Sequence, residues 1–266
     1  MFGLLEARAQ QVFIPGFWDP NNQIERPQLT GQGTVHFLTD SSFPPLHFNG
    51  IDNNLTGFSV ELARAACEKL GLTCTIQSRR FVNLLDTLKS GQGDAIAAAI
   101  PITGDLRQSF AVTGPYFKNP ARFVQKLKQD TFDNKTLIKK LAGKRIAVVS
   151  STTHEAFLQR YIPAADLKSF PDIAQAEQAL KEGTTDYIFA DGISLALWLN
   201  GTASSNCCTF VGGPFLESKY FGEGIGFIFR QEDSSLQRAF DYALYQLWKE
   251  GKYAELYLRF FPVSPY

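Results

Sequence analysis

Residues 35–77 read VHFLTDSSFPPLHFNGIDNNLTGFSVELARAACEKLGLTCTIQ and contain a strand, a helix and a second strand, in that order. The short apolar run at 35–38 stops at turn-forming residues, and 74–77 is a second run of strand length. Between them, apolar residues recur at helical spacing over 58–70, and Gly71 is placed to end that helix. This order is typical of a β-α-β unit with parallel strands.

The same alternation continues along the rest of the chain. Residues 10–33 are instead rich in Pro, Asn, Gln and Gly, which indicates an irregular arm whose aromatic residues dock on the body. The fold class is therefore α/β with mostly parallel sheets, in which ligands sit at the carboxyl ends of strands. We expect further strands at 94–99, 122–126, 145–149 and 187–190, and helices at 82–89, 137–141, 153–161, 173–182, 193–199, 236–249 and 253–260.

The composition excludes several classes of protein. A hydrophobic content of 44% over 266 residues is enough for a substantial core. Lys+Arg and Asp+Glu both number 26, and this zero net charge argues against a nucleic-acid partner. No apolar run is long enough to span a bilayer. The run at 2–5 is also too short for a signal peptide, although Ala7-Arg8-Ala9 resembles a cleavage site, so a shortened signal and an ordinary terminus both remain open.

Motifs for nucleotide binding, hydrolysis and metal binding are absent or weak. The chain has no P-loop, no GxSxG and no HExxH. Gly222 to Gly226 has nucleotide-loop spacing but does not join a strand to a helix, so we interpret it as a strand with close backbone contacts. His154 and Glu155 could act as an acid–base pair, but the start of a helix is the favoured interpretation. The three histidines are scattered and no Cys-x-x-Cys occurs, so we predict no metal and no cofactor.

Nine short motifs carry a resemblance to a known family. LTGFSVELA at 55–63 resembles the signature of the family-3 extracellular solute-binding proteins, the amino-acid receptors of ABC transporters. The histidine and lysine/arginine/ornithine receptors are the most similar members. The resemblance covers residues 34–262, and FPP at 43–45 precedes this signature as in the family. The other motifs follow it in family order: GQGDAI at 91–96, TGPY at 113–116, LAGKRIAV at 141–148, STTHE at 151–155, DYIFAD at 186–191, GGP at 212–214 and GKYAELY at 251–257.

The resemblance implies a type II periplasmic binding protein fold, with two lobes joined by a two-segment hinge. After an N-terminal arm at 1–33, lobe 1 would comprise residues 34–122 with 222–266, and lobe 2 residues 123–221. It also implies a periplasmic monomer that captures an amino acid or a related amine-bearing small molecule. This protein would deliver its ligand to an ABC transporter permease in the inner membrane.

The four cysteines are even in number, which is compatible with disulfides and an oxidising compartment. The histidine and lysine/arginine/ornithine receptors carry a disulfide from a helix to the next strand. Cys67 and Cys74 fall where its two cysteines would be. Cys207 and Cys208 are adjacent and can pair only with local backbone distortion, so their state is left open.

The family pattern assigns the ends of the ligand to particular residues. An acid on each lobe would hold the ammonium group, and Asp40 and Asp191 stand at those positions, each following a predicted strand. The alternative is that both are turn residues that cap helices. Phe43 and Phe81 match the aromatic residues that would enclose the ligand, since a ring face can carry an aliphatic stem or a cation.

The carboxylate site departs from the family pattern. Pro101 replaces a serine and has neither a hydroxyl nor an N–H, and Ala99 ends a strand that is usually serine-rich. The family's arginine aligns with Leu106, so the adjacent Arg107 is our candidate for its replacement. The rival interpretation is that Arg107 is a solvated helix residue and that the ligand is a less anionic amine.

Lobe 2 would supply further hydrogen-bond donors to the ligand's carboxylate. Residues of the same lobe also leave a second function open. Thr152 and Thr153 match the family's donors at a helix start, and His154 follows them into the pocket. An enzyme on the same fold, similar to cyclohexadienyl dehydratase, would need a catalytic acid, for which His154 and Glu155 are the candidates. A ligand-sensing domain is the third possibility.

Overall fold

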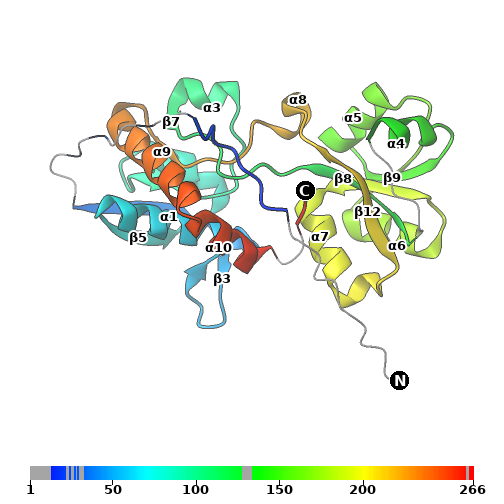
Figure 1. The fold of residues 1–266 in the computed structure, drawn as a ribbon, viewed down its shortest axis with the longest axis horizontal. Coiled ribbons are helices and arrows are strands. Elements are labelled where there is room, and N and C mark those ends of the chain that lie inside the picture. The colour runs from blue at the N-terminus through cyan, green and yellow to red at the C-terminus, as the bar shows by residue number, and fades with distance from the viewer. Residues whose placement is uncertain are drawn as a thin grey trace.

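The computed structural model describes residues 13–21, 24, 27, 29, 33–127, 134–261 and 264–266. Within these residues the chain forms two five-stranded sheets, flanked by helices and lying side by side as two lobes (Figure 1). Lobe 1 carries the sheet β5-β1-β6-β13-β7, and lobe 2 carries the sheet β10-β9-β11-β8-β12. The apolar run at 2–5 and the cleavage-like site at 7–9 lie outside the described residues.

Lobe 1 begins with the strand–helix–strand unit predicted at 35–77. Its strands β1 (Thr34–Thr39) and β5 (Thr73–Ser78) are parallel, and α1 (Phe58–Leu70) connects them. Gly71 ends α1 at a φ of 74°, a left-handed conformation that glycine adopts without strain. The lobe is completed by β6 (Ala95–Ile96), β7 (Phe110–Val112), β13 (Ile228–Arg230), α2 (Leu84–Lys89), α3 (Gly104–Ser109), α9 (Ser234–Lys249) and α10 (Lys252–Phe260).

Lobe 2 repeats the same plan between the two passages of the chain. Its sheet contains β8 (Ala121–Lys126), β9 (Arg145–Val149), β10 (Asp166–Phe170), β11 (Tyr187–Asp191) and β12 (Cys208–Phe215). Its helices are α4 (Asn134–Lys140), α5 (Thr153–Tyr161), α6 (Ile173–Glu182) and α7 (Gly192–Asn200).

The two sheets share one topology. In each, four of the five strands point the same way, in keeping with the prediction of mostly parallel sheets. The exceptions, β8 and β13, are the strands that the chain enters after crossing from one lobe to the other. The first crossing joins β7 to β8, and the second runs from β12 through α8 (Ser218–Phe221) to β13. The boundaries at 122 and 222 remain predictions.

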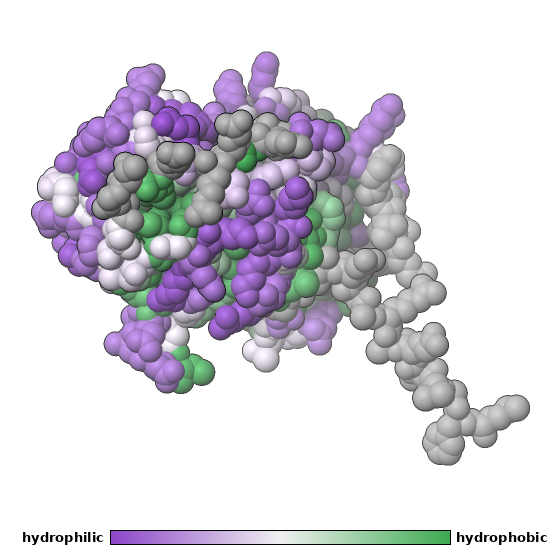
Figure 2. Space-filling model, turned by 60° about the vertical axis from the view of Figure 1, so that its left-hand side comes forward, coloured by the Kyte–Doolittle hydropathy of each residue, from purple (hydrophilic) through white to green (hydrophobic). Residues whose placement is uncertain are grey.

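The arm docks on lobe 1 through aromatic contacts, as expected, over its described part at 13–21. The ring of Trp18 lies 5.2 Å from that of Tyr253 and 5.9 Å from that of Trp248, measured between centroids. On the same lobe, the hairpin of β3 (His47–Asn49) and β4 (Leu55–Thr56) projects from the body (Figures 1 and 2). Its turn carries Ile51, a fully exposed side chain.

Both pairs of cysteines are joined. The structure connects Cys67, on α1, to Cys74, on β5, with their Cα atoms 6.0 Å apart. It also connects the adjacent Cys207 and Cys208. Among the helices that the structure describes, none is both long and apolar enough to cross a membrane. In the same part of the chain, no group of three or more His, Cys, Asp or Glu side chains could hold a metal ion.

Candidate ligand-binding site

A cavity of about 490 Å³ is lined by residues from both lobes and from both crossing segments. A neighbouring cavity of about 230 Å³ in lobe 2 shares His154 and Asp191 and adds Thr152. The predicted residues Asp40, Phe81 and Arg107 are not among those that line either cavity. Six of the ten predicted site residues line the larger one: Phe43, Ala99, Pro101, Thr153, His154 and Asp191.

The sheet topology explains why these residues meet. Asp40 directly follows β1, and Asp191 is the last residue of β11. Thr152 and Thr153 follow β9, and Ala99 lies three residues beyond β6. All these strands are parallel to a neighbour within their own sheet, so their carboxyl ends lie along one edge.

Asp191 lines the cavity and also caps α7. Its Oδ1 accepts the backbone N–H of Ser194 at 2.8 Å and the Ser194 hydroxyl at 3.0 Å. Its Oδ2 accepts a hydrogen bond from the amide of Asn119, which lies on the first crossing segment and also lines the cavity. The capping interpretation is therefore correct for Asp191, and it does not compete with a place in the cavity. Nothing in the sequence marked Asn119, because it stands in an unpatterned segment before Pro120.

His154 lines both cavities and packs against aromatic rings. Its ring centroid lies 5.1 Å from that of Phe221 and 5.8 Å from that of Phe189. Burial lowers the pKa of His154, and the nearby Asp191 carboxylate opposes this only in part. The imidazole is therefore neutral at neutral pH and does not repel a cationic ligand.

Glu155 is not among the residues that line either cavity. Its Oε2 accepts the backbone N–H of Ser151 at 2.8 Å, and its Oε1 accepts the hydroxyl of Ser169. These hydrogen bonds lower the pKa of Glu155. Among the lining residues of the larger cavity that the structure describes, Asp191 is the only carboxylate. The Thr152 hydroxyl also has its hydrogen bonds within lobe 2, since it donates to the Val149 carbonyl and accepts from the Glu155 N–H.

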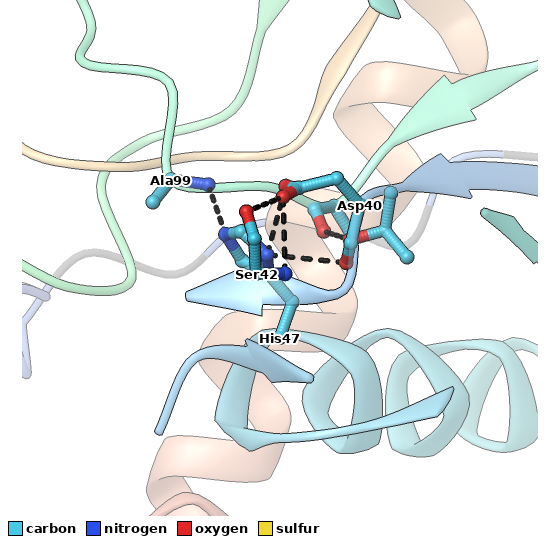
Figure 3. A network of polar contacts seen from close by, with 6 residues as sticks. Asp40, Ser42, His47 and Ala99 are labelled. Carbon is cyan, nitrogen blue, oxygen red and sulfur yellow. Dashed lines mark hydrogen bonds and ion pairs between the residues drawn. The ribbon is translucent and has the colours of Figure 1, made fainter. Parts of the chain in front are cut away.

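Asp40 is buried and is not among the residues that line the cavity. Figure 3 shows the polar contacts that it makes with Ser42 and His47. Its Oδ2 accepts the backbone N–H of Ser42 at 3.1 Å as well as the Ser42 hydroxyl. Its Oδ1 lies 2.9 Å from Nδ1 of His47, whose Nε2 lies 2.9 Å from the backbone nitrogen of Ala99. His47 thereby connects the segment after β1 to the segment after β6.

The hydrogen bonds of His47 fix its protonation. A backbone N–H can only donate, so Nε2 must accept from Ala99, and the proton of the neutral ring is on Nδ1, facing Asp40. Burial lowers the pKa of His47, with the Asp40 carboxylate opposing it, which is consistent with a neutral ring. His47 carries little signal in the sequence, where it is one histidine between the apolar residues Leu46 and Phe48.

The predicted arginine and the second predicted aromatic residue point elsewhere. Arg107 Nη2 lies 3.1 Å from Oε2 of Glu223, and this pair is largely exposed. Leu106, the preceding residue, is buried in the lobe 1 core. Phe81 stands in a short 3₁₀ turn and is 46% exposed. Among the described residues that line the larger cavity, the one lysine or arginine is Lys219, on α8, which no pattern in the sequence indicated.

Comparison with known proteins identifies the family. Residues 35–263 match the family model of the bacterial extracellular solute-binding proteins, family 3. The L-arginine-binding protein of Pseudomonas aeruginosa is 28% identical over 242 residues, which cover 90% of this chain and 92% of that protein.

Solved structures agree on the fold. The L-cystine solute receptor of Neisseria gonorrhoeae, in its unliganded open conformation, aligns with a TM-score of 0.76 at 21% identity over 88% of this chain and 94% of that one. An ancestral arginine-binding protein bound to arginine gives a TM-score of 0.56 at 26% identity over 86% of this chain and 99% of that one. The two-lobed architecture of this chain agrees with the family match over residues 35–263, and the chain therefore belongs to the bacterial extracellular solute-binding proteins, family 3.

Proposed function

We propose that this chain captures an amino acid or a related amine-bearing small molecule between its lobes and presents it to the membrane permease of an ABC transporter. The observation that carries the proposal is the cavity of about 490 Å³, lined from both lobes and holding one carboxylate, Asp191. The name of the Pseudomonas aeruginosa relative supports an amino-acid ligand.

Asp191 is the group that we assign to the ligand's ammonium. An ammonium that leaves water needs a charged or hydrogen-bonding partner, because an unpaired buried charge is very costly. Ser194 and Asn119 hold the carboxylate in place, so it does not have to reorganise when the ligand arrives. Phe43, Tyr220 and Phe221 also line the cavity and provide ring faces for an aliphatic stem or a cation.

The periplasm is the compartment that we propose, with the protein acting as a monomer. Two joined pairs of cysteines suit an oxidising compartment. We do not extend the proposal to an enzyme on this fold, because Glu155 is not among the residues that line either cavity and His154 is held neutral among aromatic rings.

A thermal-shift screen of amino acids and amines, followed by calorimetry, tests the proposal. A ligand at a hundred times its dissociation constant should add about 2.7 kcal/mol of stability. Asp191→Asn keeps the ability to cap α7 but removes the charge, and it should weaken binding by about 2 kcal/mol or more.

Asp172→Asn is the matched control. Asp172 caps α6 in the same way, with its Oδ1 accepting the Gln175 N–H at 2.9 Å, and it is exposed. Its variant should bind as the unmodified protein does. A screen without any stabilising compound, or equal losses in the two variants, would count against the proposal.

A further inference from the structure

The lobe 1 wall of the cavity offers a ligand few backbone donors. The wall is the segment that follows β6, where Ala99, Pro101 and Thr103 line the cavity, and the Thr103 hydroxyl accepts the N–H of Leu106 at 3.2 Å. The N–H of Ala99 donates to His47, and that of Ile100 donates to Ala98 at 2.8 Å. Pro101 has no N–H, and the N–H of Ile102 donates to Gly224 at 2.8 Å. Each N–H from Ala99 to Ile102 is therefore either absent or already used within lobe 1.

The charge that His47 connects to this wall is negative. Asp40 is 4% exposed, and its partner across Oδ1 is the neutral ring of His47. The carboxylate charge is thus not cancelled by the histidine. A cation at the wall is favoured by this charge, and an anion is opposed by it, since the pair is buried and poorly screened.

The basic residues near the cavity do little to offset this. Arg107 is paired with Glu223, and neither residue is among those that line the cavity. Lys219 lines the cavity from α8 but is exposed, so its attraction for an anion is screened by water and salt. Against it stand Asp191 within the cavity and Asp40, connected to the wall through His47.

We propose that the lobe 1 wall excludes carboxylate, so that the chain binds amines lacking a carboxylate more tightly than the matching amino acids. A carboxylate at Ala99 and Pro101 would lose its hydration without gaining backbone donors. An ammonium or guanidinium group at the same place is instead favoured by the negative charge of Asp40. This inference rests on the proposed function and narrows its ligand class to decarboxylated basic amino acids and similar cations.

Matched pairs of ligands that differ only in the carboxylate test this directly. Calorimetry at pH 7.5 would compare agmatine with L-arginine, cadaverine with L-lysine and putrescine with L-ornithine. We expect the amine of at least one pair to bind at least tenfold tighter than its amino acid. Amino acids that bind as tightly as their amines, or more tightly, would overturn the proposal. If an amino acid bound more tightly than its amine and lost that advantage in Lys219→Met, the result would place its carboxylate on Lys219 instead. Failure of both members of every pair would overturn this inference, while the proposed function would fall only if the broad thermal-shift screen also found no ligand.

A variant that restores donors to the wall tests the cause. Pro101→Ser adds both an N–H and a hydroxyl, and it should lower the ratio of amine to amino-acid affinity at least threefold. Pro171→Ser is the control, because Pro171 is exposed and is not among the residues lining the cavity. An unchanged ratio in Pro101→Ser, with the fold intact by circular dichroism, would show that the wall does not set the preference.

Discussion

Asp191 and Ile193 are two residues apart at the start of α7, yet Asp191 lines the ligand cavity while Ile193 is buried in the core of lobe 1. The rest of α7 packs on lobe 2, through Leu195 and Trp198. The backbone N–H of Gly192 also donates to Pro120, on the first crossing segment, at 2.7 Å. One rigid helix therefore joins the ligand contact to a contact between the lobes.

We expect Ile193→Ala to tighten ligand binding while it lowers stability. In this arrangement of the lobes Ile193, on a helix of lobe 2, packs in the core of lobe 1, and a motion of the lobes that breaks this contact is opposed by it. Removing about 1 kcal/mol of such a contact raises the apparent affinity about fivefold. Calorimetry would measure the affinity, and small-angle scattering should give a smaller radius of gyration for the unliganded variant.

Ile146→Ala provides the control for Ile193→Ala. Ile146 is fully buried in the lobe 2 core, so its loss should cost about 2–5 kcal/mol of stability without changing affinity. Weaker binding by Ile193→Ala, with an unchanged radius of gyration, would contradict the prediction.

Arg107→Ala should leave ligand affinity within about threefold. The guanidinium pairs with Glu223 outside the cavity, and an exposed pair of this kind contributes only about 0–1 kcal/mol to stability. Asp191→Asn, measured in the same calorimeter, supplies the contrast. A tenfold loss for Arg107→Ala would return this residue to the site and support the interpretation first drawn from its position beside Leu106.

The sequence predicted the periodic elements well because one physical signal determines them. The helical spacing over 58–70 and the glycine that ends it correspond to α1 without any shift. Several strands gave no such signal, and β10 and β12 are the longest of them. β10 lies at a sheet edge and is mostly exposed and polar, and β12 contains Gly212-Gly213-Pro214, which is typical of a turn. β12 accommodates them with an irregular register between Val211 and Phe215.

The order of the strands along the chain predicts which residues of the candidate site lie at the same sheet edge, but not where their side chains point. Asp191 and Thr153 follow strands, so topology brings them to one edge. The direction of a side chain depends on partners distant in sequence, and this is why Arg107 was expected in the cavity although Glu223, 116 residues away, holds it elsewhere. His47 and Ala99 are likewise 52 residues apart, and no local pattern connects them.

The Cys67–Cys74 disulfide should contribute measurably to stability. The two residues are 7 positions apart, and closing a loop of this size is worth about 2.5 kcal/mol in the chain-entropy view. Cys67→Ala with Cys74→Ala should lower the free energy of unfolding by at least that much, because Cys67 is also buried. Urea unfolding would measure the loss. The control is Cys207→Ala with Cys208→Ala. The disulfide that it removes closes a far smaller loop, so this variant should lose less stability. A larger loss in the control than in the Cys67 and Cys74 variant would contradict the prediction.

Asp241, on α9, should make stability depend on pH. Its Oδ1 accepts the N–H of Gly114, on the first crossing segment, at 2.7 Å, and its Oδ2 accepts from Gln237. Burial raises the pKa of Asp241 to about 6 from an ordinary value of 3.8, although these hydrogen bonds and Arg107 oppose the shift. The folded state therefore binds a proton that the unfolded state has already lost between about pH 4 and 6.

The sign follows from this difference in bound protons. The contribution of Asp241 is fully present below about pH 4 and is lost as the pH rises through about 6, by roughly 2–3 kcal/mol in total. Asp241→Asn keeps the acceptor for Gly114 and cannot titrate. Urea unfolding at pH 4.5 and pH 7.5 should therefore show that the variant gains stability relative to the unmodified protein as the pH rises. His47 and His154 titrate in both proteins, so their effects cancel in this comparison. A stability difference that does not change with pH would mean that the Asp241 carboxyl titrates as it does in water, and that burial at the crossing segment does not affect its charge.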